Sequence, residues 1–405
     1  MTKLERDPME KLATVLTMFQ QHQRVVYADS GAAFKVACDN RNAPEVKEFL
    51  EKCMDGVVSI FLDQKAPNVR SNLLVNFDLV LIGAAKLIVL DFEETKRMTH
   101  LETLFKLLNH ECPYYSTADT GDLGDSANKT ILSNSRGART RIQIVEFAEM
   151  HGLFEGLVSI LIDRKAPPDD TPLSSEQVRL FLAPIVAARE ILRVEDIQKA
   201  CFAAISVIEN MDEETLKLQR STDLTKVHRL LRVCLEHDDS LKQFLRSLSL
   251  KTFTSKAFQL RKLGLDLMCK ICNEASNVEN QDSFSISSMN KWFVEKEVLE
   301  KLFASSESVH PALVGRSKRL LEFMARGDAI EEKHIDMMFK SCMGLHDSVR
   351  GAVQTLLAEI SVDHLARPET GAYIFASASK QIESHLNDVL FFADKVMSFN
   401  SHRLL

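Results

Sequence analysis

The sequence predicts an all-α protein, an α-solenoid of roughly fifteen helices with two long polar insertions. Apolar residues recur at intervals of three and four along most of the chain, whereas the alternation typical of strands is almost absent. The composition agrees, because 14 Gly and 10 Pro in 405 residues are few for a loop-rich β protein. A block of sequence also repeats, since GVVSIFLDQKAP begins at Gly56 and GLVSILIDRKAP begins at Gly156. Internal repetition of this kind is typical of stacked helical units.

Both copies of the repeated block end in Lys-Ala-Pro, at Pro67 and Pro167. Proline disfavours a helical conformation in the residue before it and lacks a backbone donor, so each copy is expected to be a helix C-terminus followed by a turn. Within the second copy we expect burial of Val158, Ile160 and Ile162.

Other local signals mark helix starts and one buried helix. Ser174 and Gln177 form a capping-box pattern, and Pro44 suits a first helical turn. The most apolar stretch, residues 73–90, carries Asn76, Asp78 and Lys86. Charged and polar residues are costly in a bilayer, so we expect a helix buried between other helices and no membrane span.

Two stretches rich in Ser, Asp, Asn and Gly interrupt the helical pattern and divide the chain. The expected parts are N-terminal helical repeats at 1–111, a mobile polar insertion at 112–140, middle repeats at 141–272, a polar linker at 273–290, and C-terminal repeats at 291–405.

The net charge of −7 provides no general attraction for polyanions, so nucleic acid is not an expected partner. Two small basic clusters are interpreted as solvated helix faces: Arg136, Arg139 and Arg141, and then Arg316, Lys318 and Arg319. Eight scattered cysteines without a secretory leader favour reduced thiols and a cytoplasmic location, with the nucleus as the alternative.

Few patterns suggest chemistry. Cys269 and Cys272 form a CxxC pair inside a helical segment without a second ligand pair nearby, so we interpret them as packing residues. Cys342 and His346 resemble a nucleophile and base in spacing, but a helix end and turn explain them as well. Trp292 lies on a wide apolar stripe and is expected in the core, with an interface anchor as the alternative. No metal or cofactor is expected.

Three segments carry a family resemblance: KWFVEKEVLEKLF, HPALVGRSKRLLEFM and EEKHIDMMFKSCMGLHDSVRGAVQTLLAEI. Between Trp292 and about Phe375 the chain resembles the armadillo-like helical region of the very large ubiquitin-specific proteases of the fat-facets type. The chain departs from the family pattern at Phe339, where the family has Trp. The matching positions, expected to be structural or interaction residues, are Trp292, Arg316, Ser317, His334, Phe339, Lys340, Gly344, His346 and Arg350.

The resemblance implies an armadillo/HEAT-like scaffold arm of a ubiquitin carboxyl-terminal hydrolase-like protein. In the family this region precedes a cysteine-type deubiquitinase domain, whose GxTCYxN and GHY boxes do not occur in the chain. The chain itself is therefore expected to be non-catalytic and to bind other proteins, including ubiquitinated substrates or ubiquitin-pathway components. Two alternatives remain: a stand-alone armadillo/HEAT adaptor with no ubiquitin link, and an enzyme that uses the CxxC pair or Cys342 with His346.

Overall fold

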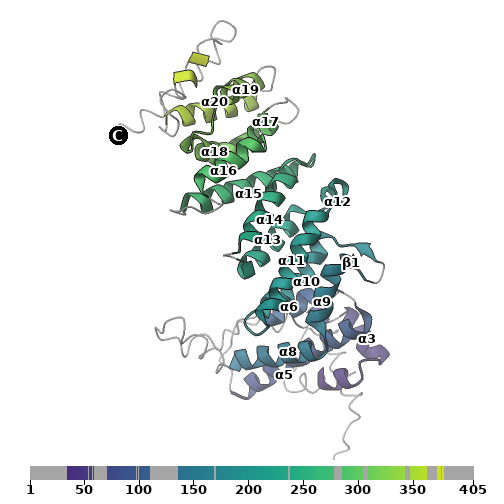
Figure 1. Cartoon of the computed structure of the whole chain (residues 1–405). Coiled ribbons are helices and arrows are strands. Elements are labelled where there is room, and N and C mark those ends of the chain that lie inside the picture. The colour runs from purple at the N-terminus through teal and green to yellow at the C-terminus, as the bar shows by residue number, and fades with distance from the viewer. Residues whose placement is uncertain are drawn as a thin grey trace, which may run out of the picture. The chain divides into compact units, whose positions relative to one another are not determined.

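The protein is represented by a computed structural model that divides into two compact units (Figure 1). One unit spans Met1–Met211 and Thr222–His237, and the other spans Asp212–Ser221 and Asp238–Leu405. The residues that the structure describes are 34–52, 54–56, 58, 71–96, 98, 100–109, 136–167, 170–235, 238–277, 285–303, 309–342, 347–362, 372–374 and 376–377.

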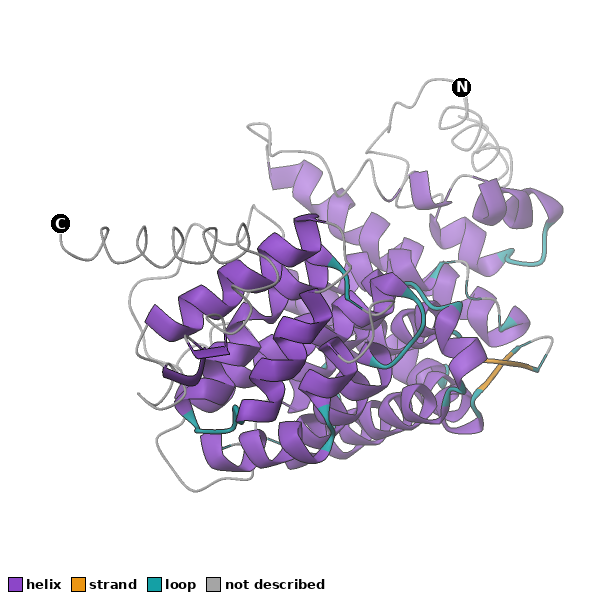
Figure 2. Ribbon diagram, turned by 90° about the horizontal axis from the view of Figure 1, so that it is seen from above, coloured by secondary structure: helices purple, strands orange, loops and turns teal. Residues whose placement is uncertain are grey.

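The described part of the first unit contains helices and one small pair of strands, drawn in orange in Figure 2. Its helices contact others that lie near them in the chain: α5 packs on α6 and α8, α9 on α11, and α10 on α6, α9 and α11. The elements are α3 (Pro44–Lys52), α5 (Ser71–Thr95), α6 (Leu101–Asn109), α8 (Arg136–Met150), α9 (Leu153–Asp163), β1 (Lys165–Ala166), β2 (Thr171–Pro172), α10 (Ser175–Ala187), α11 (Val194–Asn210) and α13 (Ser221–Leu235).

The second unit is built in the same way. Helix α15 packs on α14, α16 and α18, and α20 packs on α18 and α19. Its elements are α12 (Glu213–Lys217), α14 (Asp239–Phe253), α15 (Phe258–Asn277), α16 (Ile286–Glu295), α17 (Val298–Phe303), α18 (Pro311–Arg326), α19 (Glu332–Cys342) and α20 (Asp347–Val362). Contacts between helices that are close in the sequence are typical of an α-solenoid, so the predicted all-α fold class is confirmed.

Helix α5 contains the apolar stretch at 73–90, and the predicted buried helix is present. Ala84, Ala85 and Leu87 are fully buried, because α6, α8 and α9 all pack against this helix. Its charged residue Lys86 places Nζ 4.8 Å from the centre of the Phe147 ring on α8, where the aromatic face stabilises the cation. None of the described helices has the length and apolarity that crossing a membrane would require.

The repeated block is described in its second copy, and the predicted helix end is confirmed there. Helix α9 stops at Asp163, and Arg164 caps it in the left-handed conformation with φ 58°. The chain then forms an antiparallel hairpin in which Lys165 pairs with Pro172 and Ala166 with Thr171. Most of the first copy lies outside the described residues.

The burial expected within this copy was partly wrong. Ile162 is 47% exposed, whereas the buried positions of α9 include Leu157, Val158 and Leu161. An α-helix repeats every 3.6 residues, so positions two apart point to different sides and cannot all face one neighbour.

The start of α10 has the predicted capping box. The Ser174 hydroxyl oxygen accepts from the Gln177 backbone N–H at 3.2 Å, and the Gln177 side-chain oxygen accepts from the Ser174 N–H at 2.8 Å. These two bonds satisfy backbone donors that a helix start leaves without an intrahelical partner. Proline stands at the first position of α3, as the sequence suggested for Pro44.

The expected polar segments are only partly described. The linker proposed at 273–290 overlaps the end of α15 and the start of α16, where Ala275 and Met289 are fully buried. Both helices thus extend into the polar stretch, where these two apolar residues are buried. Of the insertion proposed at 112–140, residues 112–135 lie outside the described residues, and α8 begins at Arg136.

Helices α14 and α15 approach each other closely at Gly264. A Cβ atom placed there would overlap the backbone N of Phe253 and lie 2.6 Å from the carbonyl oxygen of Ser249. Backbone atoms cannot move aside as a flexible side chain can, so only glycine permits this contact. Gly315, inside α18, offers the opposite case, since a Cβ atom there would meet nothing within 4 Å.

We predict that Gly264→Ala destabilises the second unit by about 1–3 kcal/mol, because α14 and α15 must separate. The matched control Gly315→Ala should instead stabilise it by as much as about 1 kcal/mol, since alanine favours helix. Trp292, the only tryptophan, lies in this unit, so its fluorescence during urea unfolding measures both effects. Equal effects of the two substitutions would contradict the assigned helix contact.

Candidate functional site

The residues that suggested a family lie on the helices of the second unit, but they do not form one cluster. Ser317 and His334 are buried, and Phe339 is 5% exposed, so these three belong to the core. Arg316 and Lys340 are exposed on the surfaces of α18 and α19. Arg350 is half-buried on α20, and Gly344 and His346 lie outside the described residues. The positions therefore include both packing and surface residues.

His334 joins two helices. Its Nδ1 accepts a hydrogen bond from the backbone N–H of Glu331 at 2.9 Å, at the start of α19. Its Nε2 lies 3.1 Å from the Glu300 carboxylate on α17. Because Nδ1 acts as the acceptor, the geometry assigns the ring proton to Nε2, which donates to Glu300. The ring thus accepts from a backbone N–H at the start of α19 and links this helix to α17.

Arg316 and its neighbour Ser317 connect α18 to the helices around it. Arg316 Nη1 forms an ion pair with Asp266 on α15 at 2.5 Å, and its carbonyl oxygen accepts from the Cys269 thiol at 3.5 Å. The buried Ser317 hydroxyl donates to the Val314 carbonyl at 2.7 Å within the helix. These contacts give the two residues structural roles at the α15–α18 interface.

Trp292 is half-buried on α16, while the adjacent Phe293 is fully buried. The two rings lie 5.1 Å apart, and Phe293 meets Phe323 of α18 edge to face at 6.1 Å. The predicted stripe is therefore in the core, but Phe293 occupies its centre and Trp292 lies at its margin.

The CxxC pair has the environment of packing residues. Burial raises the pKa of Cys269 to about 11 and also raises that of Cys272, so both thiols are protonated at neutral pH. In the part of the chain that is described, no group of three or more His, Cys, Asp or Glu residues could hold a metal ion. Cys342 ends α19, but its side chain and His346 lie outside what is described, so that pair stays a prediction.

A thiol pair that the sequence analysis did not identify links α11 and α13. A hydrogen bond between Cys201 and Cys234 raises the pKa of Cys201, which burial raises further, and lowers the pKa of Cys234. The two residues are 33 positions apart, and no local spacing could reveal their contact. Both are free cysteines, and Cys201 is fully buried.

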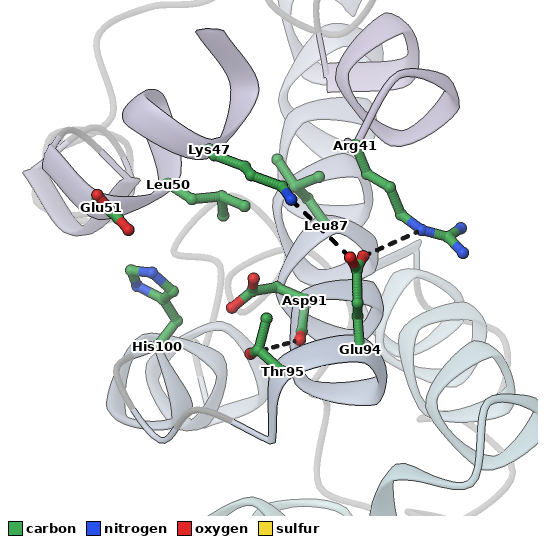
Figure 3. Close-up of a pocket in the computed structure, with 9 residues that line it drawn as sticks. All are labelled: Arg41, Lys47, Leu50, Glu51, Leu87, Asp91, Glu94, Thr95 and His100. Carbon is green, nitrogen blue, oxygen red and sulfur yellow. Dashed lines mark hydrogen bonds and ion pairs between the residues drawn. The ribbon is translucent and has the colours of Figure 1, made fainter. Parts of the chain in front are cut away.

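A pocket in the first unit lies between α3, α5 and the start of α6, and Figure 3 shows its lining. Glu94 forms ion pairs with Arg41 at 3.8 Å and Lys47 at 3.9 Å, so positive and negative side chains pair inside the pocket. The full lining is Arg41, Lys47, Leu50, Glu51, Leu87, Asp91, Glu94, Thr95 and His100.

His100 at the edge of this pocket has a carboxylate partner. Its Nδ1 lies 3.2 Å from Asp55, which also accepts from the Thr103 hydroxyl. Burial alone would raise the pKa of Asp55, but these hydrogen bonds outweigh it and lower that pKa. The described lining contains no Ser or Cys, and the Thr95 hydroxyl donates to the Asp91 carbonyl at 2.8 Å. The pocket therefore lacks a recognisable nucleophile beside this histidine.

We predict that His334→Ala destabilises the second unit by about 1–3 kcal/mol, because the Glu331 N–H and the Glu300 carboxylate lose a buried partner. Lys333→Ala is the matched control, since exposed Lys333 also approaches Glu300, at 3.9 Å, and its loss should change little. Urea unfolding followed by Trp292 fluorescence compares the two. A loss of equal size in both variants would contradict the bridging role of His334.

Comparison with known proteins supports the resemblance inferred from the sequence. Residues 238–389 match the family model described as the UBP24/USP9X/USP9Y ARM repeat. The match includes α14 to α20 and encloses the stretch between Trp292 and Phe375 that carried the resemblance. Comparison with curated proteins found no match to the chain. Residues 238–389 are thus similar to the armadillo repeat of UBP24, USP9X and USP9Y.

Proposed function

We propose that the chain is a non-catalytic scaffold arm of a ubiquitin carboxyl-terminal hydrolase-like protein and positions substrates or partners for it. The observation that carries the proposal is the match of residues 238–389 to an armadillo-repeat model of ubiquitin-specific proteases. Stacked helices present an extended surface along which segments of other proteins can bind. We propose the cytoplasm as the location, with the nucleus as the alternative.

The described cysteines support the non-catalytic part of this proposal. Burial raises the pKa of Cys38 and of Cys269 to about 11, which leaves these thiols protonated and poorly nucleophilic at neutral pH. Cys234 has a lowered pKa, but it owes this to the hydrogen bond from Cys201. A nucleophilic thiol in a hydrolase is instead activated by an adjacent base.

We predict that the whole chain, used as an affinity bait in cell extract with deubiquitinases inhibited, enriches ubiquitin-modified proteins. A version lacking residues 112–135, which leaves α8 whole from Arg136, should retain part of this set, because the described helices remain. Detection with an antibody to ubiquitin and mass spectrometry measures the enrichment. Partners without ubiquitin modification would instead favour a stand-alone adaptor, and no partner with either version would contradict the scaffold role.

We further predict that ubiquitin carrying a C-terminal thiol-reactive group forms no covalent adduct with the chain. A catalytic domain of a ubiquitin-specific protease is the positive control, and elemental analysis of the purified chain should give no stoichiometric zinc. An adduct that disappears with Cys342→Ser would overturn the non-catalytic assignment. Zinc that disappears with Cys269→Ser and Cys272→Ser together would do the same.

A further inference from the structure

A second pocket lies between α15 and α18. These two helices pack against each other within the armadillo-matched region, and both are labelled in Figure 1. Asn273 and Ser276 of α15 and Arg319 and Arg326 of α18 lie along its exposed rim. Phe323, which is 4% exposed, lies at its base. The pocket is thus polar at its rim, with an amide, a hydroxyl and two guanidinium groups.

The basic residues of α18 divide into two groups by helix geometry. Arg316 pairs with Asp266 of α15, and Lys318 pairs with Glu322 along the helix at 3.9 Å. Arg319 and Arg326 form no ion pair with any other residue in the described ranges. Seven residues are close to two helical turns, so these two arginines lie on the same face of α18 and both line the pocket.

The electrostatic balance of the pocket is positive. Its lining includes one carboxylate, that of Glu322, and this group already has Lys318 as its counterion. The pocket also contains Cys272, whose pKa is raised by burial, so its thiol adds no negative charge at neutral pH. The pocket is therefore lined by two guanidinium groups, each with five hydrogen-bond donors, and its single carboxylate is already paired with Lys318.

We propose that this pocket binds an extended, acidic peptide segment of a partner protein, with carboxylates accepting hydrogen bonds from Arg319 and Arg326. The inference rests on the proposed scaffold function and names the chemistry of one partner site. Residues seven apart lie about 10.5 Å apart along a helix axis. A peptide in the extended polyproline II conformation has three residues per turn and advances about 3.1 Å per residue, so acidic residues three positions apart lie on one face about 9.3 Å apart and match this spacing.

A peptide fits these observations better than a nucleic acid does. The chain has a net charge of −7, which opposes a polyanion that must contact many phosphates, whereas two arginines suffice for two carboxylates. Recognition of acidic motifs by arginine clusters is an established mode of peptide binding.

The test is fluorescence polarisation of a labelled peptide with two glutamates three positions apart, titrated with the whole chain. We expect binding that weakens with added salt, and loss of affinity by about tenfold or more in Arg319→Gln/Arg326→Gln. Lys291→Gln/Lys340→Gln is the matched control, because it also removes two positive charges from the second unit, at exposed positions on α16 and α19 that do not line the pocket. This control should bind the peptide as the unaltered chain does.

A charge exchange keeps the test independent of folding defects. Arg319→Glu/Arg326→Glu should lose the glutamate peptide and gain a peptide with lysines at the same positions. The proposal would be overturned if a peptide with glutamines in place of the glutamates bound equally well, or if the double variants kept their affinity. It would also be overturned if inorganic phosphate or single-stranded RNA displaced the labelled peptide and unlabelled peptide did not.

Affinity capture separates this inference from the scaffold function. If the Arg319→Gln/Arg326→Gln chain still captures every partner of the unaltered chain, the pocket proposal fails and the scaffold function stands. If the unaltered chain binds the acidic peptide but captures no protein from cell extract, the scaffold function fails and the pocket remains a peptide site.

Discussion

The packing of α15 between its neighbours is the constraint on which the second unit depends. Leu265, Met268 and Ile271 are fully buried, and the helix contacts α14, α16 and α18. Close approach to α14 requires the absence of a side chain at Gly264, and α18 is held by the ion pair between Asp266 and Arg316. The same helix forms one wall of the arginine-lined pocket, so packing and surface chemistry share one element.

Several polar groups in the described residues connect helices to one another. His334 joins α19 to α17, Lys86 of α5 lies over an aromatic ring of α8, and Cys201 contacts Cys234. Each contact satisfies a polar group that burial would otherwise make costly. Of the thiols that suggested chemistry in the sequence, Cys269 likewise donates to a neighbouring helix, at the Arg316 carbonyl of α18.

Local rules accounted well for helices and poorly for contacts between them. The capping box at Ser174 and the buried helix at 73–90 follow from spacing within one turn and from continuous apolarity, and both were predicted. Burial of Ile162 was predicted wrongly, because alternate positions do not share a helix face. The candidate site could be predicted only in part: the family resemblance identified His334 and Arg316, but their partners Glu300 and Asp266 are 34 and 50 positions away.

The sequence by itself determined the all-α class, the helix ends and the armadillo resemblance, since periodicity, capping and motifs depend on residues close together in the chain. Tertiary structure alone decided which of three neighbouring cations is available to a partner. Arg316, Lys318 and Arg319 are almost consecutive, but each residue turns the helix by about 100°. One therefore reaches Asp266, one reaches Glu322, and Arg319 joins Arg326 in the pocket.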